Sequence, residues 1–219
     1  MKLVDGWWFP DHEQHLIEWM ANPKSRMILN GRPAYQGTKI QQALKLVRPN
    51  TECRTAVDVG GHIGLWSYNL APEFRAVEAF EPCDAHRECF RKNVDATNVT
   101  LNAYALGERE GSVSLFTGPA SSGDTWVKGN GEIPMRTLDS FALRDVDFIK
   151  IDCEGYEEFV LRGAEILIGT WRPIIVVEQK RDHATKFGLK PQGAVDYLTK
   201  VHGYRVESVM SGDFFMVPA

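Results

Sequence analysis

A glycine-rich turn that follows a β-branched run constrains this sequence more than any other feature. Residues 55–59 read Thr-Ala-Val-Asp-Val, and residues 60–64 continue as Gly-Gly-His-Ile-Gly into an apolar stretch typical of a helix. Glycine permits such a turn and lets a ligand approach the backbone closely. Glu81 is expected at the end of the next strand, where the hydroxyls of a bound ribose need an acceptor. The sequence therefore predicts a site for a nucleoside-containing cofactor.

The order of the glycines indicates which cofactor this is. Dinucleotide-binding proteins favour Gly-x-Gly-x-x-Gly, where the helix amino terminus receives an anionic pyrophosphate. Here Asp58 precedes the turn, and an acid at that place suits a cationic ligand better. S-adenosylmethionine carries an ammonium and a sulfonium and has no phosphate. We therefore expect a methyl-donor site for S-adenosylmethionine, with a dinucleotide site as the alternative.

Length and composition limit the remaining classes of protein. The 219 residues suit one α/β domain. The net charge of −4 comes without a clustered Lys/Arg stripe, which disfavours a nucleic-acid partner. No apolar run approaches the roughly 20 residues that cross a bilayer, no signal-peptide pattern is present, and the four cysteines form no metal or redox motif. We expect a cytoplasmic protein without a membrane or nucleic-acid partner, and the oligomeric state is left open.

Apolar runs alternate with helix-period stretches, which indicates a parallel sheet covered by helices. Strands are predicted over 55–59, 76–80, 99–105, 147–152 and 174–178, and helices over 84–94, 156–168 and 191–202. Residues 204–210 and 214–217 are predicted to form an antiparallel hairpin that closes the sheet.

Two segments lie outside this alternation. After a short strand over 112–116, the Gly/Ser-rich stretch 117–132 shows no periodicity and is predicted to be a loop. It is either a lid that offers Trp126 as a stacking surface or a connector whose Trp packs on the body. Residues 1–35, with a helix expected over 11–21, form an amino-terminal arm that either caps the substrate side or covers a sheet edge. The methyl-donor domain is expected over 36–219.

Seven separated motifs stand in one order along residues 36–219. They are VDVGGHIG (57–64), AFEP (79–82), NAYALGEREG (102–111), MRTLDSF (135–141), FIKIDCEGYE (148–157), VVEQ (176–179) and DFFMVP (213–218). In this order they resemble the FkbM family of S-adenosylmethionine-dependent methyltransferases. The resemblance implies a Rossmann-like class I methyltransferase fold, with a seven-stranded, mostly parallel sheet, an antiparallel carboxyl-terminal strand and helices on both faces. It also implies O-methylation of sugars or other small-molecule hydroxyls.

The turn departs from the family pattern, most notably at His62. The family generally has Gly-Ala-Asn-Ile-Gly there, and this chain has His62 in place of the asparagine. His62 either contacts the methionine part of the donor, projects toward the acceptor, or is an inert loop residue. The residues expected to bind the cofactor are Asp58, Gly60, Gly61, His62, Gly64, Glu81, Asn102 and Ala105.

The candidate catalytic residues lie at two adjacent strand ends, where ligands bind in open α/β sheets. Lys150, Asp152 and Glu154 end the fourth core strand, and Glu178 ends its neighbour. Two converging carboxylates form either a general base with its orienting partner or a site for a divalent cation such as Mg²⁺. Helix capping is the competing explanation for Glu154 and the better one for Glu157. Further base candidates, unless they are surface-loop residues, are Asp182 and His183.

The sequence thus predicts an S-adenosylmethionine-dependent O-methyltransferase acting on a sugar or another small molecule. An NAD-dependent oxidoreductase would share the strand, turn and acid. A noncatalytic S-adenosylmethionine-binding module would bind the donor without transferring its methyl group. A nucleic-acid methyltransferase would need a basic face that the composition does not show.

Overall fold

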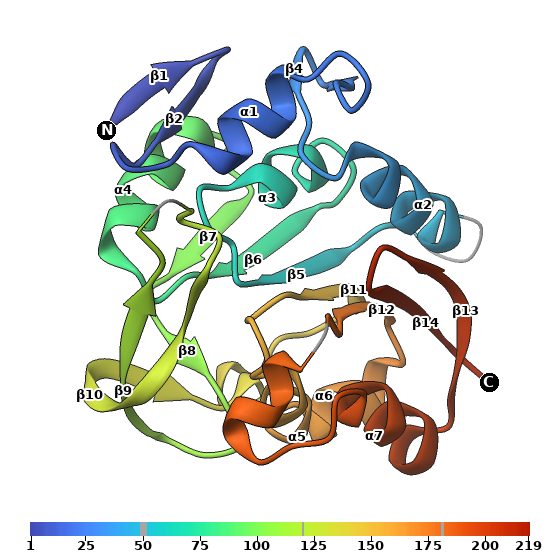
Figure 1. Cartoon of the computed structure of the whole chain (residues 1–219). Helices are drawn as coiled ribbons and strands as arrows, with labels where there is room; N and C mark the ends of the chain where they lie inside the picture. The colour runs from blue at the N-terminus through green and yellow to red at the C-terminus, as the bar shows by residue number, and fades with distance from the viewer. Residues whose placement is uncertain (49–51, 120, 181) are drawn as a thin grey trace.

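A mostly parallel β-sheet runs through the middle of the computed structural model, which describes residues 1–48, 52–119, 121–180 and 182–219 (Figure 1). Within these residues the sheet has seven strands, in the spatial order β13 (Tyr204–Met210), β14 (Asp213–Pro218), β12 (Ile174–Glu178), β11 (Val146–Ile151), β5 (Thr55–Val59), β6 (Ala76–Phe80) and β7 (Val99–Asn102). The five strands from β12 to β7 are parallel, and β14 pairs antiparallel with β12 and β13. The predicted fold class and the predicted carboxyl-terminal hairpin are confirmed.

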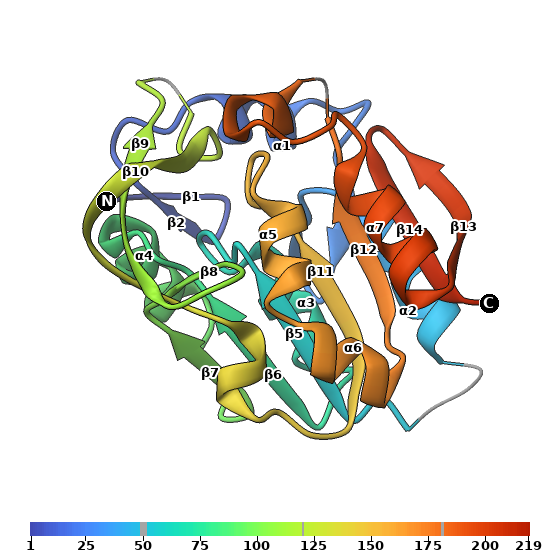
Figure 2. The same ribbon diagram turned by 90° about the horizontal axis from the view of Figure 1, so that it is seen from below.

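Helices cover both faces of this sheet (Figures 1 and 2). One layer holds α2 (Gly37–Val47), α3 (Leu65–Leu70) and α4 (Asp84–Asn93), and the other holds α5 (Glu157–Arg162), α6 (Glu165–Trp171) and α7 (Gly193–His202). Phe148 and Ile149 are neighbours in β11, yet they belong to different core clusters, because successive strand side chains point to opposite faces. The described residues also form two 3₁₀ helices, η1 (Leu138–Phe141) and η2 (His183–Phe187).

A second, smaller sheet replaces much of the predicted loop over 117–132. β9 (Gly111–Thr117) pairs antiparallel with β10 (Thr125–Arg136), and β8 (Ala105–Leu106) pairs parallel with β10. The loop prediction is therefore wrong for 125–132, and residue 120 of that stretch lies outside the described residues. Register shifts around Gly129 break the two-residue alternation. At Gly131 a Cβ would lie 2.5 Å from the Ser114 nitrogen, so the strands approach too closely for a side chain.

Two other predicted elements are divided. The expected strand over 99–105 is split into β7 and β8, which belong to different sheets. The expected helix over 156–168 is split into α5 and α6 at Gly163. A Cβ on Gly163 would lie 2.0 Å from the Gly107 carbonyl oxygen, so the chain passes here against another backbone segment.

The amino-terminal arm packs beside the glycine turn. It contains β1 (Lys2–Val4), β2 (Trp7–Phe9), α1 (His15–Ala21), β3 (Ile28–Leu29) and β4 (Arg32–Pro33), so the helix begins later than the predicted residue 11. Trp7, Phe9 and Leu16 share a buried cluster with Ile63 and Leu65 of the turn and α3. The division of the chain at residue 36 stays a prediction. No helix formed by the described residues combines the length and the apolar character needed to cross a bilayer.

Gly163→Ala should lower the free energy of unfolding by about 1–3 kcal/mol, because the added methyl group forces Gly107 away. Gly169→Ala in α6 is the matched control, since no described atom lies within 4 Å of its Cβ position and alanine favours a helix. Urea denaturation of both variants measures this difference. Equal stability of the two variants would contradict the close approach at Gly163.

Candidate active site

A pocket opens at the carboxyl ends of β5, β6, β11 and β12, where an open α/β sheet is expected to bind its ligands. Its empty volume is about 1040 Å³, including the open solvent at its mouth. Parts of the chain far apart in sequence line it: the turn, the strand ends, the arm and the β9–β10 hairpin. The lining residues used below are Leu16, Tyr35, Gln36, Gly60, Gly61, His62, Glu81, His86, Tyr104, Ala105, Ser122, Trp126, Lys150, Asp152, Glu154, Glu178 and Lys180.

Glycines in the turn are required by packing as well as by conformation. Gly60 has a φ of +76°, and its Cβ would lie 2.0 Å from the Asp152 carbonyl oxygen. The amide groups of Gly60 and Gly61 both donate to the Phe80 carbonyl oxygen, at 3.0 Å each, which ties the turn to β6. Gly64 has a φ of +92° and faces Val94 and Phe90. Gly60 and Gly61 therefore line the pocket, whereas Gly64 packs against α4 and the residue after it.

Glu81 is held by three donors at the end of β6. Its Oε2 accepts from the His62 amide at 2.8 Å, and its Oε1 accepts from the Cys83 amide at 2.8 Å and lies 3.3 Å from His86 Nδ1. A carboxylate has about four acceptor positions. Among the described residues the His62 amide donates to Oε2, which leaves a position on that oxygen for a ligand hydroxyl. Burial raises the pKa of Glu81, but the bonds from His86 and the two amides outweigh it and lower that pKa.

Two histidines beside Glu81 differ in charge. Burial lowers the pKa of His86, but its interactions with Cys83 and Glu81 outweigh this effect and raise the pKa to about 10. Burial and the charge of His86 lower the pKa of His62 well below its ordinary value. At neutral pH His86 is therefore an imidazolium and His62 a neutral imidazole, with their ring centroids 4.5 Å apart.

Asp58 lies beneath the pocket instead of on its wall. It is fully buried, its Oδ2 accepts from Ser67 Oγ at 2.7 Å, and its Oδ1 lies 3.3 Å from Lys150 Nζ. Lys150 also donates to the Gly60 carbonyl oxygen at 2.9 Å. The ion pair of Asp58 and Lys150 fixes the turn to β11. Contact between Asp58 and the donor stays a prediction.

Asp152 and Glu178 form an acidic pair at the ends of β11 and β12. Burial would raise the pKa of Asp152, but Lys150 and Lys180 lower it, and Glu178 adds a hydrogen bond. Burial and the Asp152 charge raise the pKa of Glu178 to about 10. Two negative charges so close together repel each other, so at neutral pH the pair keeps one proton. The opposite pKa shifts place the negative charge on Asp152.

Glu154 and Glu157 follow the same strand and have different roles. Burial and Asp152 raise the pKa of Glu154 to about 8, and its Oε2 lies 2.8 Å from His183 Nδ1. Glu157 Oε1 accepts from the Cys153 and Gly155 amides, at 3.0 and 2.9 Å, and so caps the turn that leads into α5. This capping role for Glu157 agrees with the sequence-based prediction.

The pocket gathers most, but not all, of the predicted site residues. It brings together Gly60, Gly61, His62, Glu81, Ala105, Lys150, Asp152, Glu154 and Glu178. Asn102 points elsewhere, because its amide donates to Glu78 Oε2 at 2.9 Å. Sequence reasoning missed several lining residues, namely Tyr35, Gln36, His86, Ser122 and Lys180. Lys180 could have been found from the sequence, because it stands two residues after Glu178 at the same strand end. The residues of the arm reach the pocket only through tertiary packing.

Comparison with known proteins assigns this chain to a family. The model of the methyltransferase FkbM domain matches residues 58–206, which contain the turn, Glu81 and both strand-end acids. The chain belongs to the FkbM methyltransferase family. It is an S-adenosylmethionine-dependent methyltransferase, and the oxidoreductase alternative is set aside. No curated protein matches the chain.

Solved structures share the fold at low sequence identity. An FkbM methyltransferase from Methylobacillus flagellatus has 18% identity and a TM-score of 0.51, covering 77% of this chain and 45% of its own. Precorrin-6y C5,15-methyltransferase from Geobacter metallireducens has 17% identity and a TM-score of 0.50, covering 89% and 93%. A proposed methyltransferase from Streptococcus mutans, solved with SAH, has 8% identity and a TM-score of 0.51, covering 81% and 94%. The chain spans less than half of the Methylobacillus protein.

The His86–Glu81 pair should make stability depend on pH. The folded-state pKa of His86, about 10, exceeds its ordinary value of 6.5. Its stabilising contribution is therefore full below about pH 6.5, declines above it, and is lost once pH passes about 10. The difference in the free energy of unfolding between the wild type and His86→Gln should narrow from about pH 6 to about pH 10. Urea denaturation at several pH values measures it, and a constant difference would contradict the pairing.

Proposed function

We propose that this methyltransferase is an O-methyltransferase whose acceptor is a hydroxyl group of a sugar or another small molecule. One observation carries the proposal: a ribose-type acceptor, Glu81, and an ionised acid, Asp152, line the same pocket. Glu81 follows β6 and Asp152 follows β11, and β5 lies between these two strands. A donor bound at one end and an acceptor hydroxyl at the other would therefore meet beside the turn.

The donor end fits S-adenosylmethionine through specific groups. Glu81 keeps a position on Oε2 for a ribose hydroxyl, and Gly60 and Gly61 expose backbone in place of side chains. Tyr104 and Ala105 border the same end of the pocket, beside the ends of β6 and β7. When bound, S-adenosylmethionine supplies an electrophilic methyl group on a sulfonium. The surrounding residues orient the donor and exclude water, which together can lower the barrier by several kcal/mol.

The acceptor end supplies a base. A hydroxyl must lose its proton during or after attack on a methyl group, and a positioned base assists that step. Asp152 is ionised at neutral pH, whereas burial and the Asp152 charge raise the pKa of Glu178 to about 10. We therefore assign proton acceptance to Asp152 and its orientation to protonated Glu178. An acceptor amine that arrives uncharged needs no such base, so this pair favours a hydroxyl.

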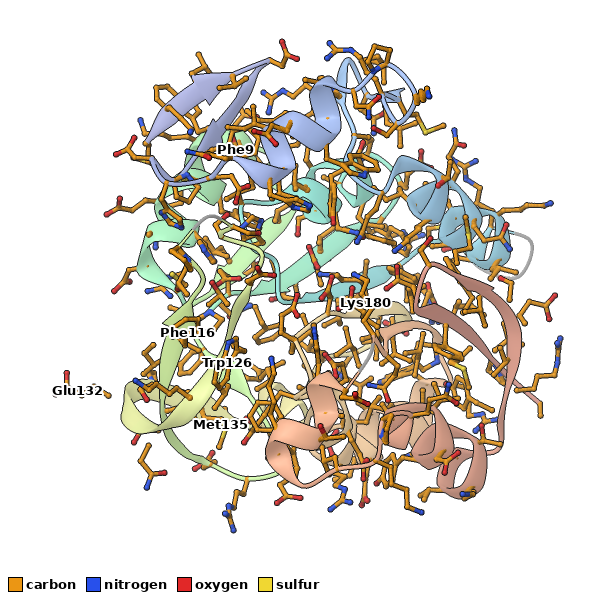
Figure 3. The ribbon with its side chains drawn as sticks, viewed as in Figure 1. Phe9, Phe116, Trp126, Glu132, Met135 and Lys180 are labelled. Atoms are coloured by element: carbon orange, nitrogen blue, oxygen red, sulfur yellow. The ribbon has the colours of Figure 1, made fainter. Side chains whose placement is uncertain are left out.

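Aromatic surfaces beside these acids suit a compact ring. The Trp126 ring packs against Phe116 of the same β9–β10 hairpin, with ring centroids 5.4 Å apart (Figure 3). Tyr35 of the arm lines the pocket together with Trp126. Such flat faces can pack against the ring of a sugar or of an aromatic alcohol. The net charge of −4 gives no electrostatic reason to prefer a nucleic acid.

A divalent cation is the second explanation for these acids, and the side chains present fit it less well. Ligand atoms of Glu154, Glu178 and His183 lie within 4.8 Å of one another, and carboxylates suit Mg²⁺. However, the Lys180 ammonium contacts Glu178 Oε1, and His183 Nδ1 lies 2.8 Å from Glu154 Oε2. A cation would have to displace both contacts. We therefore propose base assistance without a metal ion.

Glu81→Gln should weaken binding of S-adenosylhomocysteine roughly tenfold to a hundredfold, because a hydrogen bond to a charged acceptor is lost. Glu78→Gln is the matched control: it lies on the same strand and bonds Asn102 instead of lining the pocket. Glu78→Gln should bind S-adenosylhomocysteine with the same affinity as the wild type. Isothermal titration calorimetry measures all three proteins, and an unchanged affinity of Glu81→Gln would remove the ribose assignment.

Methyl transfer should occur to hydroxyl compounds when the protein is incubated with radiolabelled S-adenosylmethionine and a panel of sugars, nucleotide sugars, phenols and amines. Asp152→Asn should lower kcat roughly 10²- to 10⁴-fold for the best acceptor, because the base is lost, while leaving donor affinity unchanged. Turnover should survive EDTA. Transfer only to amines, or full turnover by Asp152→Asn, would refute the base assignment, and loss with EDTA that Mg²⁺ restores would favour the metal explanation.

A further inference from the structure

Three side chains from distant segments meet at the edge of the pocket. Glu13 lies between β2 and α1, Ser122 lies between β9 and β10, and His62 belongs to the glycine turn. Ser122 donates to Glu13 Oε2 through its amide at 2.6 Å and through its hydroxyl at 2.5 Å, and His62 Nε2 lies 2.7 Å from Ser122 Oγ. Glu13 and Ser122 have no exposed surface. The arm and the β9–β10 connection are thus both tied to the turn by polar contacts.

The order of these contacts fixes where each hydrogen lies. Glu13 acts as an acceptor at both oxygens, because the Leu16 amide donates to its Oε1 at 2.7 Å and Ser122 donates to its Oε2. A serine hydroxyl has one hydrogen, and that hydrogen is directed to Glu13. His62 Nε2 must therefore donate to Ser122 Oγ. Because neutral imidazole carries one N–H, His62 is held as the Nε2–H tautomer, with a lone pair on Nδ1.

His62 in turn contacts the pair that faces the ribose. Its amide donates to Glu81 Oε2 at 2.8 Å, and its ring meets the His86 ring edge to face at 4.5 Å. His86 Nδ1 lies 3.3 Å from Glu81 Oε1. A neutral ring can pack closely against the His86 imidazolium, whereas a charged ring would repel it. Burial lowers the pKa of His62, and the charges of His86, Lys150 and His12 lower it further. The Glu81 carboxylate faces the His62 amide.

We propose that Glu13 and Ser122 are positioning residues for donor binding, acting through His62. They hold His62 in one tautomer and one place, and His62 steadies the His86–Glu81 pair on which the ribose depends. The donor site is then complete only when the arm and the β9–β10 connection are docked on the turn. This inference rests on the proposed donor site at Glu81.

A substitution at Ser122 separates the effect of these contacts on the site from their effect on the fold. A buried carboxylate is costly unless it is fully hydrogen-bonded. Ser122→Ala leaves Glu13 its two amide donors, so the fold should persist, but it removes the acceptor that orients His62 Nε2. Ser121→Ala is the matched control, because Ser121 is the adjacent hydroxyl residue and its side chain has no part in these three contacts.

Two measurements test the proposal. In the donor-free wild type, long-range ¹H–¹⁵N NMR correlations of the His62 ring should show the Nε2–H tautomer. Ser122→Ala should lose this fixed tautomer and bind S-adenosylhomocysteine roughly five- to twentyfold more weakly by calorimetry. Ser121→Ala should match the wild type in both measurements, and thermal unfolding should show that both variants fold.

The outcomes separate this inference from the proposed function. If NMR shows that His62 carries its proton on Nδ1 in the wild type, the proposal that Ser122 fixes the Nε2–H tautomer is wrong. Donor affinity of Ser122→Ala within about twofold of the wild type would overturn the positioning role, because loss of a net hydrogen bond should exceed that change. If wild-type His62 is the Nε2–H tautomer but Glu81→Gln binds S-adenosylhomocysteine normally, the donor site at Glu81 is wrong. The contacts among Glu13, Ser122 and His62 then serve the fold alone.

Discussion

The buried ion pair between Asp58 and Lys150 joins the two halves of the active site. Lys150 Nζ lies 3.3 Å from Asp58 Oδ1 and donates to the Gly60 carbonyl oxygen, so the turn after β5 is fixed to β11. Burial opposes the charge on Lys150, but Asp58 and Asp152 raise its pKa and keep it protonated. The same ammonium lowers the pKa of Asp152. One cation thus positions the backbone at the donor end and helps to keep the acid at the acceptor end ionised.

Sequence reasoning succeeded where a local pattern determined the outcome. The turn, Glu81 and the strand-end acids were predictable because parallel strands place their carboxyl ends at one edge of the sheet. Sequence patterns did not reveal the features that depend on tertiary contacts. The buried position of Asp58, paired with Lys150 and Ser67, depends on tertiary contacts that its residue type does not reveal. The 117–132 stretch lacked periodicity because Gly129 and its register shifts interrupt a real strand.

The remaining walls of the pocket come from segments whose docking no local pattern reveals. Gln36, the residue that follows the arm, accepts from the Trp66 indole at 2.7 Å, which brings this point of the chain to α3 and the pocket. Trp126 belongs to the β9–β10 hairpin and lines the pocket. The hairpin is held there because β10 pairs with β8, the short strand that follows β7 in the chain. These segments line the pocket but lie outside the seven-stranded sheet, so they can differ without altering the shared fold. Acceptor preference is therefore expected to depend on them more than on the strand ends.

We propose that donor and acceptor bind in one pocket, with the ribose at Glu81 and the reactive centre beside Asp152. A crystal structure with S-adenosylhomocysteine tests this claim most directly. We expect a ribose hydroxyl within hydrogen-bonding distance of Glu81 Oε2 and the sulfur on the side of the turn that faces Asp152. A ribose bound away from Glu81, or a sulfur separated from Asp152 by the body of the protein, would contradict the account.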